Sequence, residues 1–179
     1  MSDKKFPNLK LKSDFRMPAH KVVELYNLLG ENGVEIWVDG GWGVDALLEE
    51  QTREHSDLDI AVDHSHEAKM KKILDSIGYK VVRVSDKTEW NYILGDGKSQ
   101  IDVHVFGFDT TGNNTYGTKY PKESLTGTGK INGLTVRCID PVWMVQFHTR
   151  YELADTDRHD VKALCKKFDI ELPKSHRTQ

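Results

Sequence analysis

Two aspartates, Asp57 and Asp59, stand one residue apart at the start of a β-rich run that ends at Val62. Because side chains alternate across a strand, both carboxylates are expected on one face, opposite Leu58. Neighbouring carboxylates repel each other, and aspartate is depleted in strands. A divalent cation would offset that repulsion, and Mg²⁺ is commonly held by one or two carboxylates together with substrate phosphates. The pair therefore predicts a magnesium site, with solvated acids at a strand edge as the alternative.

A third acid, Asp102, lies in an alternating run over residues 99–106, and His104 falls on the same face of that run. If this strand lies beside the strand of the acid pair, three carboxylates converge. Asp102 would then complete a two-metal site or accept a proton from an attacking hydroxyl group. Taken alone, Asp102 is equally compatible with a solvent-facing position. For His104 three roles stay open: a base, a partner of the acids, or a polar residue on the strand face.

A pair of glycines, Gly40 and Gly41, separates a short β-rich run from an apolar helical run. Glycine lets the backbone approach a ligand closely, and the free N–H groups of a helix N-terminus bind phosphate. A tight turn without a ligand is the alternative, because the pair matches neither of the common glycine-rich phosphate loops. Trp42 could line a nucleotide site or pack in the core. Arg53 and His55, just before the acid pair, could contact a triphosphate or lie in a solvated loop.

The remaining patterns predict the elements that would position these side chains. Helices are expected over residues 18–29, after the glycine pair to 48, and over 65–77, 142–151 and 155–168. Strands are expected over residues 35–38, 57–62, 79–84, 90–94 and 99–106, with an Asn-Gly hairpin over 131–139. This order predicts a mixed β-sheet with packed helices, of the α/β (α+β) class.

The predicted domain organisation has three parts. An irregular N-terminal lead-in covers residues 1–18, a core covers 19–139, and C-terminal helices packed on the core cover 140–172. Residues 107–130 are rich in glycine, threonine and asparagine and predict a long loop with little structure of its own. Loops of that length in a compact domain are often functional.

Composition narrows the classes of protein that fit. The chain has 179 residues, of which 37% are hydrophobic and 30% charged, and its formal net charge is −3. This balance predicts a globular protein and disfavours a large nucleic-acid interface. The two cysteines, Cys138 and Cys165, form no metal-binding spacing and are expected to be reduced and buried. No apolar run reaches membrane-spanning length, so a cytoplasmic protein without a membrane partner is expected.

The combination of motifs resembles the nucleotidyltransferase superfamily that includes DNA polymerase β. The matching residues are Gly40-Gly41-Trp42, Asp57-Leu58-Asp59 and Asp102. Longer segments are similar to the small lincosamide nucleotidyltransferases, with aminoglycoside 2''-nucleotidyltransferases as neighbours. These segments cover residues 37–45, 52–60, 101–104 and 147–157.

The resemblance implies a polymerase-β-like fold and a Mg²⁺-dependent transfer of a nucleoside monophosphate, AMP from ATP, to a hydroxyl group of an antibiotic. A lincosamide is the expected small-molecule acceptor. An aminoglycoside is one alternative, and a nucleotide-binding or antitoxin-like module on the same fold is another. The implied metal ligands are Asp57, Asp59 and Asp102; the implied catalytic residues are Asp57, Asp59, Asp102 and His104; the implied nucleotide contacts are Gly40, Gly41, Trp42, Arg53 and His55. The loop over residues 107–130 departs from the family and is expected near the acceptor. A homodimer is left open.

Overall fold

The computed structural model describes residues 15–84, 89–149 and 155–176. Its first half contains α1 (Ala19–Glu31), β1 (Ile36–Asp39), α2 (Gly40–Leu48), β2 (Asp57–Asp63), α3 (His64–Ser76), β3 (Lys80–Val84) and β4 (Asn91–Gly95). Its second half contains β5 (Gln100–Phe108), β6 (Asn114–Gly117), η1 (Lys122–Thr126), β7 (Gly127–Ile131), β8 (Leu134–Cys138), α4 (Pro141–Phe147), α5 (Asp155–Phe168) and η2 (Lys174–His176). No helix in these ranges is long and apolar enough to cross a membrane.

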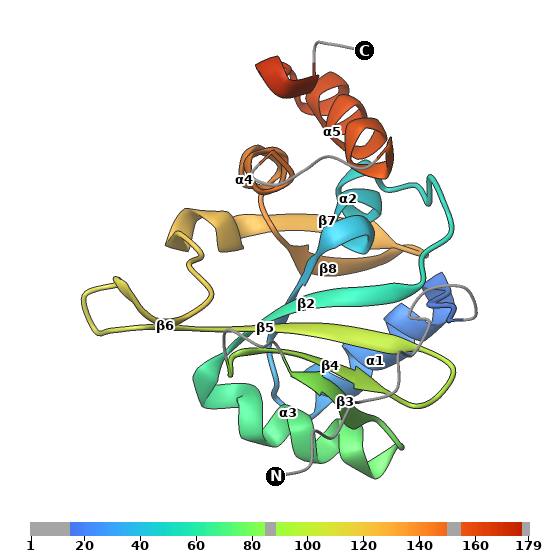
Figure 1. Ribbon diagram of the computed structural model, residues 1–179, viewed down its shortest axis with the longest axis vertical. Helices are drawn as coiled ribbons and strands as arrows, with labels where there is room; N and C mark the ends of the chain where they lie inside the picture. Colours follow the sequence, from blue (N-terminus) through green and yellow to red (C-terminus); the bar gives the residue numbers. More distant parts are fainter. Residues whose placement is uncertain (1–14, 85–88, 150–154, 177–179) are drawn as a thin grey trace, which may run out of the picture.

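The strands form one mixed sheet in the order β3-β4-β5-β2-β1-β8-β7, and β6 pairs with β5 outside this path (Figure 1). β2 pairs in parallel with β5, and β1 pairs in parallel with β8, whereas the other pairs are antiparallel. The expected mixed sheet with packed helices is confirmed. The expected boundaries of a core and a C-terminal helical part stay a prediction.

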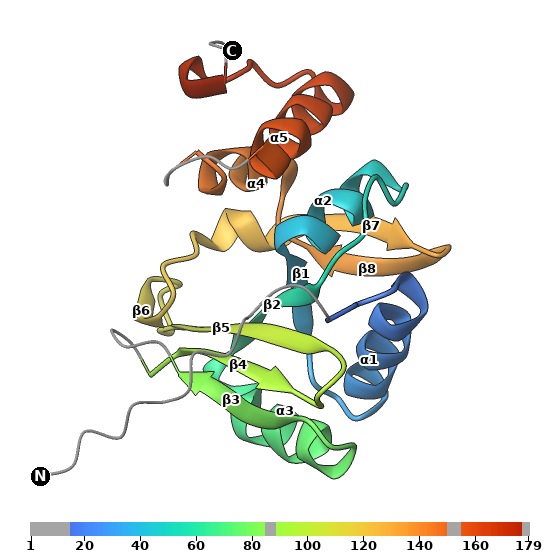
Figure 2. The ribbon, with the colours of Figure 1, turned by 45° about the vertical axis from the view of Figure 1, so that its right-hand side comes forward.

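Part of the core lies on the face of the sheet that α1 and α3 cover (Figures 1 and 2). In the two central strands, β2 and β5, every second side chain points to this face and is buried. The fully buried members of this alternation are Leu58, Ile60, Val62, Ile101, Val103 and Val105. The helices add apolar side chains at helical spacing, namely Val22, Leu25, Leu29, Met70 and Leu74. The polar alternate positions are thereby turned to the opposite face.

The helix α2 packs on the β7–β8 hairpin, and α4 and α5 pack on α2 and on each other (Figure 2). The backbone of α2 approaches β7 so closely that a Cβ atom at Gly129 would lie 2.2 Å from the carbonyl oxygen of Ala46. The hairpin itself closes through Asn132 and Gly133, whose φ angles of 48° and 79° are left-handed. The Asn-Gly hairpin is thus confirmed, since Ile131 pairs with Leu134 across the turn. Both cysteines are free and buried, as expected.

The prediction of a long loop over residues 107–130 is wrong, because this segment contains β6, η1 and β7. Glycine is disfavoured in strands, so the run of glycines suggested a loop. Here glycines serve close backbone contacts instead. Gly117 has a φ of 71°, and a Cβ atom there would lie 2.0 Å from the carbonyl oxygen of Val105. In β7 the inward positions are Gly127, Gly129 and Ile131, and all three are buried.

The helix expected over residues 142–151 is shorter, since α4 ends at Phe147. Side chains that follow the helix bond to its last carbonyl groups. The Thr149 hydroxyl group donates to the carbonyl oxygen of Gln146 at 2.7 Å, and His148 Nδ1 lies 2.9 Å from that of Met144. Such local bonds compete with another helical turn. Tyr151, the expected end, lies outside the described residues.

Candidate active site

Strand register places three carboxylates side by side across the sheet. Asp39 at the end of β1 pairs with Asp59 on β2, and Asp59 pairs in turn with Asp102 on β5. Residues in register face the same side, so Asp39, Asp59 and Asp102 form one row, called the acid row below. The expectation that the strand of Asp102 lies beside that of the acid pair is confirmed. Asp39 was not foreseen, because its place in the row depends on pairing between β1 and β2.

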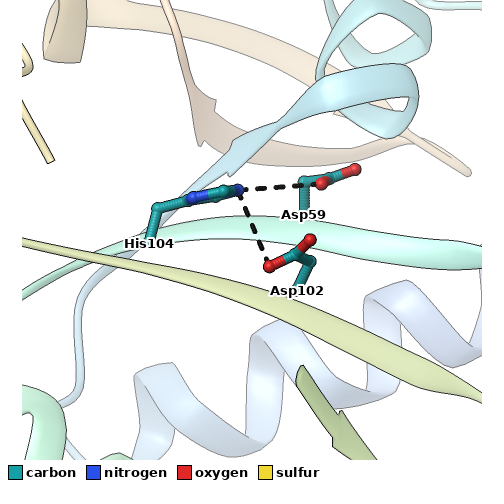
Figure 3. A group of neighbouring side chains, drawn as sticks. All are labelled: Asp59, Asp102 and His104. Carbon is teal, nitrogen blue, oxygen red and sulfur yellow. Dashed lines mark ion pairs between the residues drawn. The ribbon is translucent and has the colours of Figure 1, made fainter. Parts of the chain in front are cut away.

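His104 reaches into the acid row from the next outward position of β5 (Figure 3). Its Nε2 atom lies 3.8 Å from Asp59 Oδ1 and 3.9 Å from Asp102 Oδ1. These separations exceed hydrogen-bond length. One ligand atom from each of the three side chains lies within 4.8 Å of the other two. The geometry therefore brings Asp59, Asp102 and His104 together around one point.

The electrostatics of this group reflect concentrated negative charge. Burial raises the pKa of Asp102 to about 6; His104 opposes this rise, while the carboxylates of Asp59 and Asp57 add to it. Burial alone would lower the pKa of His104. The surrounding carboxylates, Asp59 first among them, outweigh burial and raise the pKa of His104 to about 9. The strands thus hold acids together at an electrostatic cost that a cation would remove.

The donor set fits a divalent cation. Two carboxylates and an imidazole offer oxygen and nitrogen ligands, and all are partly exposed, so a solvated ion can enter. Asp57 shares the outward face of β2 with Asp59 but is not one of the three residues within 4.8 Å. Its charge is close enough to contribute to the raised pKa of Asp102. The three residues that the structure gathers as possible metal ligands are therefore Asp59, Asp102 and His104, and Asp57 lies beside them on the same face of β2.

The first residues of α2, Gly40 and Gly41, form a turn, called the glycine turn below, that lies directly against the acid row. Gly40 has a φ of 55°, and a Cβ atom there would lie 2.2 Å from Asp59 Oδ2. Asp39 is the N-cap residue of α2, and its Oδ1 accepts from the Gly40 N–H group at 2.8 Å. The turn therefore brings the N-terminus of α2, an end that favours anions, beside the metal-ligand candidates.

The side chains of Arg53 and His55 lie behind the second glycine and are engaged with acids. His55 Nε2 lies 2.5 Å from Asp45 Oδ2, and Arg53 Nη1 lies 3.0 Å from His55 Nδ1. Arg53 Nη2 donates to Asp160 Oδ2 at 2.9 Å. A Cβ atom at Gly41 would lie 2.4 Å from Arg53 Nη2. This chain of contacts joins α2, the approach to β2 and α5 just beneath the glycine turn.

The structure does not bring all the expected nucleotide contacts to the acid row. The Trp42 side chain is 2% exposed; its indole nitrogen donates to the carbonyl oxygen of Met17 at 3.0 Å, and its ring packs on His55. This placement favours packing over contact with a ligand. The roles of Trp42, Arg53 and His55 in nucleotide binding stay predictions. Asp160 was missed because it reads as part of the polar face of an amphipathic helix.

We predict that the ion pair between Arg53 and Asp160 stabilises the packing of α5 on the core. Asp160 is 2% exposed and Arg53 31% exposed. Replacing Asp160 with alanine is expected to lower the free energy of unfolding by about 2–3 kcal/mol, because it leaves a half-buried guanidinium group without its partner. Denaturant unfolding measures this loss.

The matched control is Glu54→Ala, which removes a surface ion pair with Arg16. Those side chains are 82% and 60% exposed and 3.5 Å apart. Surface pairs contribute about 0–1 kcal/mol, so this variant is expected to unfold close to the wild type. Equal losses in both variants would contradict a structural role for Asp160.

The sequence is similar to a family of known antibiotic-modifying enzymes. A family model described as aminoglycoside-2''-adenylyltransferase matches residues 21–164. A lincosamide resistance protein from Staphylococcus haemolyticus is 31% identical over 140 residues, which cover 73% of this chain and 84% of that protein. A 2''-aminoglycoside nucleotidyltransferase from Escherichia coli is 26% identical over 89 residues, which cover 48% of this chain and 49% of that protein.

Solved structures with the same arrangement include two antibiotic-modifying enzymes. The lincosamide antibiotic adenylyltransferase LnuA with lincomycin bound has a TM-score of 0.72 and 26% identity, covering 87% of this chain and 99% of that one. ANT(2'')-Ia in complex with adenylyl-2''-tobramycin has a TM-score of 0.70 and 17% identity, covering 84% and 88%. The fold is therefore similar to that of nucleotidyltransferases.

Proposed function

The chain belongs to the aminoglycoside-2''-adenylyltransferase family of antibiotic nucleotidyltransferases, and from this premise we propose that it transfers AMP from ATP to a hydroxyl group of a lincosamide. The observation that carries the proposal is the acid row beside the glycine turn at the start of α2. The lincosamide assignment is supported by similarity along most of a lincosamide resistance protein, against about half of the aminoglycoside enzyme.

The proposed reaction needs little covalent chemistry from the protein. The acceptor oxygen forms a bond to the α-phosphorus of ATP, and the bond from that phosphorus to pyrophosphate breaks. Asp57 and Asp59 would hold Mg²⁺, which supplies charge neutralisation on the phosphates when bound. The Gly40 N–H group is capped by Asp39, and the N–H groups that follow it at the start of α2 would face the triphosphate.

Asp102 is proposed either to accept the proton of the acceptor hydroxyl group or to complete the metal site. Its carboxylate lies across from Asp59, where both roles are within reach. The variant Asp102→Asn separates them. A lost metal ligand lowers the affinity for Mn²⁺, whereas a lost base lowers the rate of transfer and leaves that affinity close to the wild-type value. His104 is the alternative base. A His104 variant is tested in the same way, by comparing its rate of transfer with its affinity for Mn²⁺.

The direct test of function is the mass of the product. The protein is incubated with ATP, Mg²⁺ and one antibiotic at a time: lincomycin, clindamycin or tobramycin. Each mixture is analysed for pyrophosphate and for an adenylylated antibiotic. We expect an adenylylated lincosamide. A product with tobramycin alone would move the acceptor assignment to the aminoglycosides. The absence of any product with all three antibiotics would contradict the proposal.

A further inference from the structure

Tyr120 connects the segment between β6 and η1 to the acid row. Its side chain is 4% exposed, and its hydroxyl group donates to Asp39 Oδ2 at 2.6 Å. Its ring packs edge-on against Phe106 at 5.8 Å and Phe147 at 5.7 Å between ring centroids. The ring therefore has a packing role, and the hydroxyl group has a separate, polar one.

The hydroxyl group completes the hydrogen bonding of Asp39. Asp39 Oδ1 accepts from the Gly40 N–H group at 2.8 Å, and Oδ2 accepts from Tyr120. The two bonds fix the orientation of the carboxylate and turn it toward the backbone of α2. Burial and the adjacent Asp39 raise the pKa of Tyr120, so its hydroxyl group is a donor at neutral pH.

The orientation of Asp39 matters because Asp39 stands directly across from Asp59. A carboxylate without this restraint can rotate toward its neighbour. It would then add negative charge beside Asp59 and release the cap on the glycine turn. Gly40 is already in contact with Asp59, since a Cβ atom there would lie 2.2 Å from Oδ2. A small shift of the turn is therefore transmitted to the metal-ligand candidate.

The segment that carries Tyr120 is itself held in place. Asn114 Nδ2 donates to the carbonyl oxygens of Thr118 and Tyr120, at 2.8 and 3.1 Å. Trp37, on the outward face of β1, donates to the carbonyl oxygen of Leu125 at 2.7 Å. The segment that carries Tyr120 is thus fixed by hydrogen bonds, and this holds the Tyr120 hydroxyl group at Asp39, as a positioning group requires.

We propose that Tyr120 is a positioning residue, whose hydroxyl group fixes the Asp39 carboxylate as the cap of α2 and thereby sets the glycine turn against Asp59. This inference rests on the proposed function for the identity of the reaction. Its structural content, the restraint of Asp39 and Gly40, can be measured without an antibiotic.

The first variant is Tyr120→Phe, which removes the hydroxyl group and keeps the ring contacts. We expect the affinity for Mn²⁺, measured by electron paramagnetic resonance, and kcat each to fall about tenfold, as is typical for loss of an outer supporting bond. KM for the acceptor is expected to change little. The exchange rate of the Gly40 amide proton, followed by NMR, is expected to rise.

The matched control is Tyr79→Phe. Tyr79 is another buried tyrosine, at 2% exposure, and its hydroxyl group bonds to Ser99 outside the acid row. Each of the two variants loses one buried hydroxyl hydrogen bond, so both are expected to lower the unfolding midpoint, but Tyr79→Phe is expected to leave Mn²⁺ affinity and kcat at the wild-type level. A tyrosine that only packs would behave like this control.

A double-mutant cycle tests whether Tyr120 acts through Asp39. In the Asp39→Asn background, adding Tyr120→Phe is expected to change Mn²⁺ affinity by less than about twofold, since the restrained carboxylate is already gone. Full tenfold effects in that background would overturn the proposal. So would a Tyr120→Phe variant with unchanged Mn²⁺ affinity and unchanged Gly40 exchange. A wild-type protein that binds Mn²⁺ but modifies no antibiotic would sink the proposed function alone.

Discussion

Replacing Asp59 with asparagine is expected to lower the rate of nucleotidyl transfer by about a thousandfold. The substitution keeps the shape of the side chain but removes a charged metal ligand, and a bound metal supplies several kcal/mol of charge stabilisation in such reactions. Initial rates of pyrophosphate release with saturating ATP measure the loss. Mn²⁺ binding measured on the same sample checks that the cause is a lost ligand.

The stability of Asp59→Asn is expected to equal or exceed that of the wild type in the absence of metal. Asp59 lies between Asp39 and Asp102 in the acid row, so the substitution relieves repulsion on both sides. His104 loses a favourable partner in the same step, which limits the gain. Denaturant unfolding at neutral pH distinguishes this outcome from general damage to the fold.

Asp63→Asn is the matched control for this prediction. Asp63 lies on the same strand and the same face as Asp59, four residues further along β2, where it caps α3 by accepting from the Ser65 N–H group. Asparagine caps helices as well as aspartate does, so activity and stability are expected to stay near wild type. Near-full activity in Asp59→Asn would refute the metal assignment.

Much of the site follows from local patterns in the sequence. Alternation along β2 places Asp57 and Asp59 on one face of that strand, and alternation along β5 places Asp102 and His104 on one face of theirs, because a strand has a period of two. The apolar alternate positions mark the buried face and fix which side is turned outward. A glycine pair before a helix marks the turn beside them. These signals depend only on residues close together in the chain.

The remaining parts depend on contacts between distant segments, and no local pattern encodes them. Asp39 joins the acid row only through the pairing of β1 with β2. Tyr120 lies 81 residues from Asp39, in a stretch whose glycines suggested a loop. Arg53 was expected at the phosphates, but its partner Asp160 lies 107 residues away on α5. Side-chain partners at such separations are decided by the packing of whole elements.

Gly40→Ala is expected to reduce activity by about a hundredfold or more, because the added methyl group displaces the Asp59 carboxylate. A Cβ atom at Gly40 would lie 2.2 Å from Asp59 Oδ2 and 2.6 Å from its Cγ, so the side chain must move. The φ of 55° adds a backbone penalty of about 1–2 kcal/mol for a residue with a side chain. Rates of transfer and denaturant unfolding measure the two effects separately.

Gly33→Ala is the matched control, because it introduces backbone strain without a steric clash between the new methyl group and a carboxylate. Gly33 has a similar φ of 67°, and the nearest atom to its Cβ position is the flexible end of Lys69 at 3.7 Å. It is expected to lose a similar amount of stability through strain and to keep its activity. If Gly33→Ala lost activity in proportion to stability, the effect of Gly40→Ala would reflect destabilisation and not a displaced carboxylate.

The double variant Gly40→Ala/Asp59→Asn then tests the route of the damage. If the methyl group acts by moving the Asp59 side chain, the double variant should be about as inactive as Asp59→Asn alone, because residues in contact couple strongly. Independent losses would multiply instead and would assign Gly40 a second role, the close approach of the α2 backbone to the triphosphate. Activity requires glycine at position 40 in either case. Only the first outcome would show that the reason is the space that the Asp59 side chain needs.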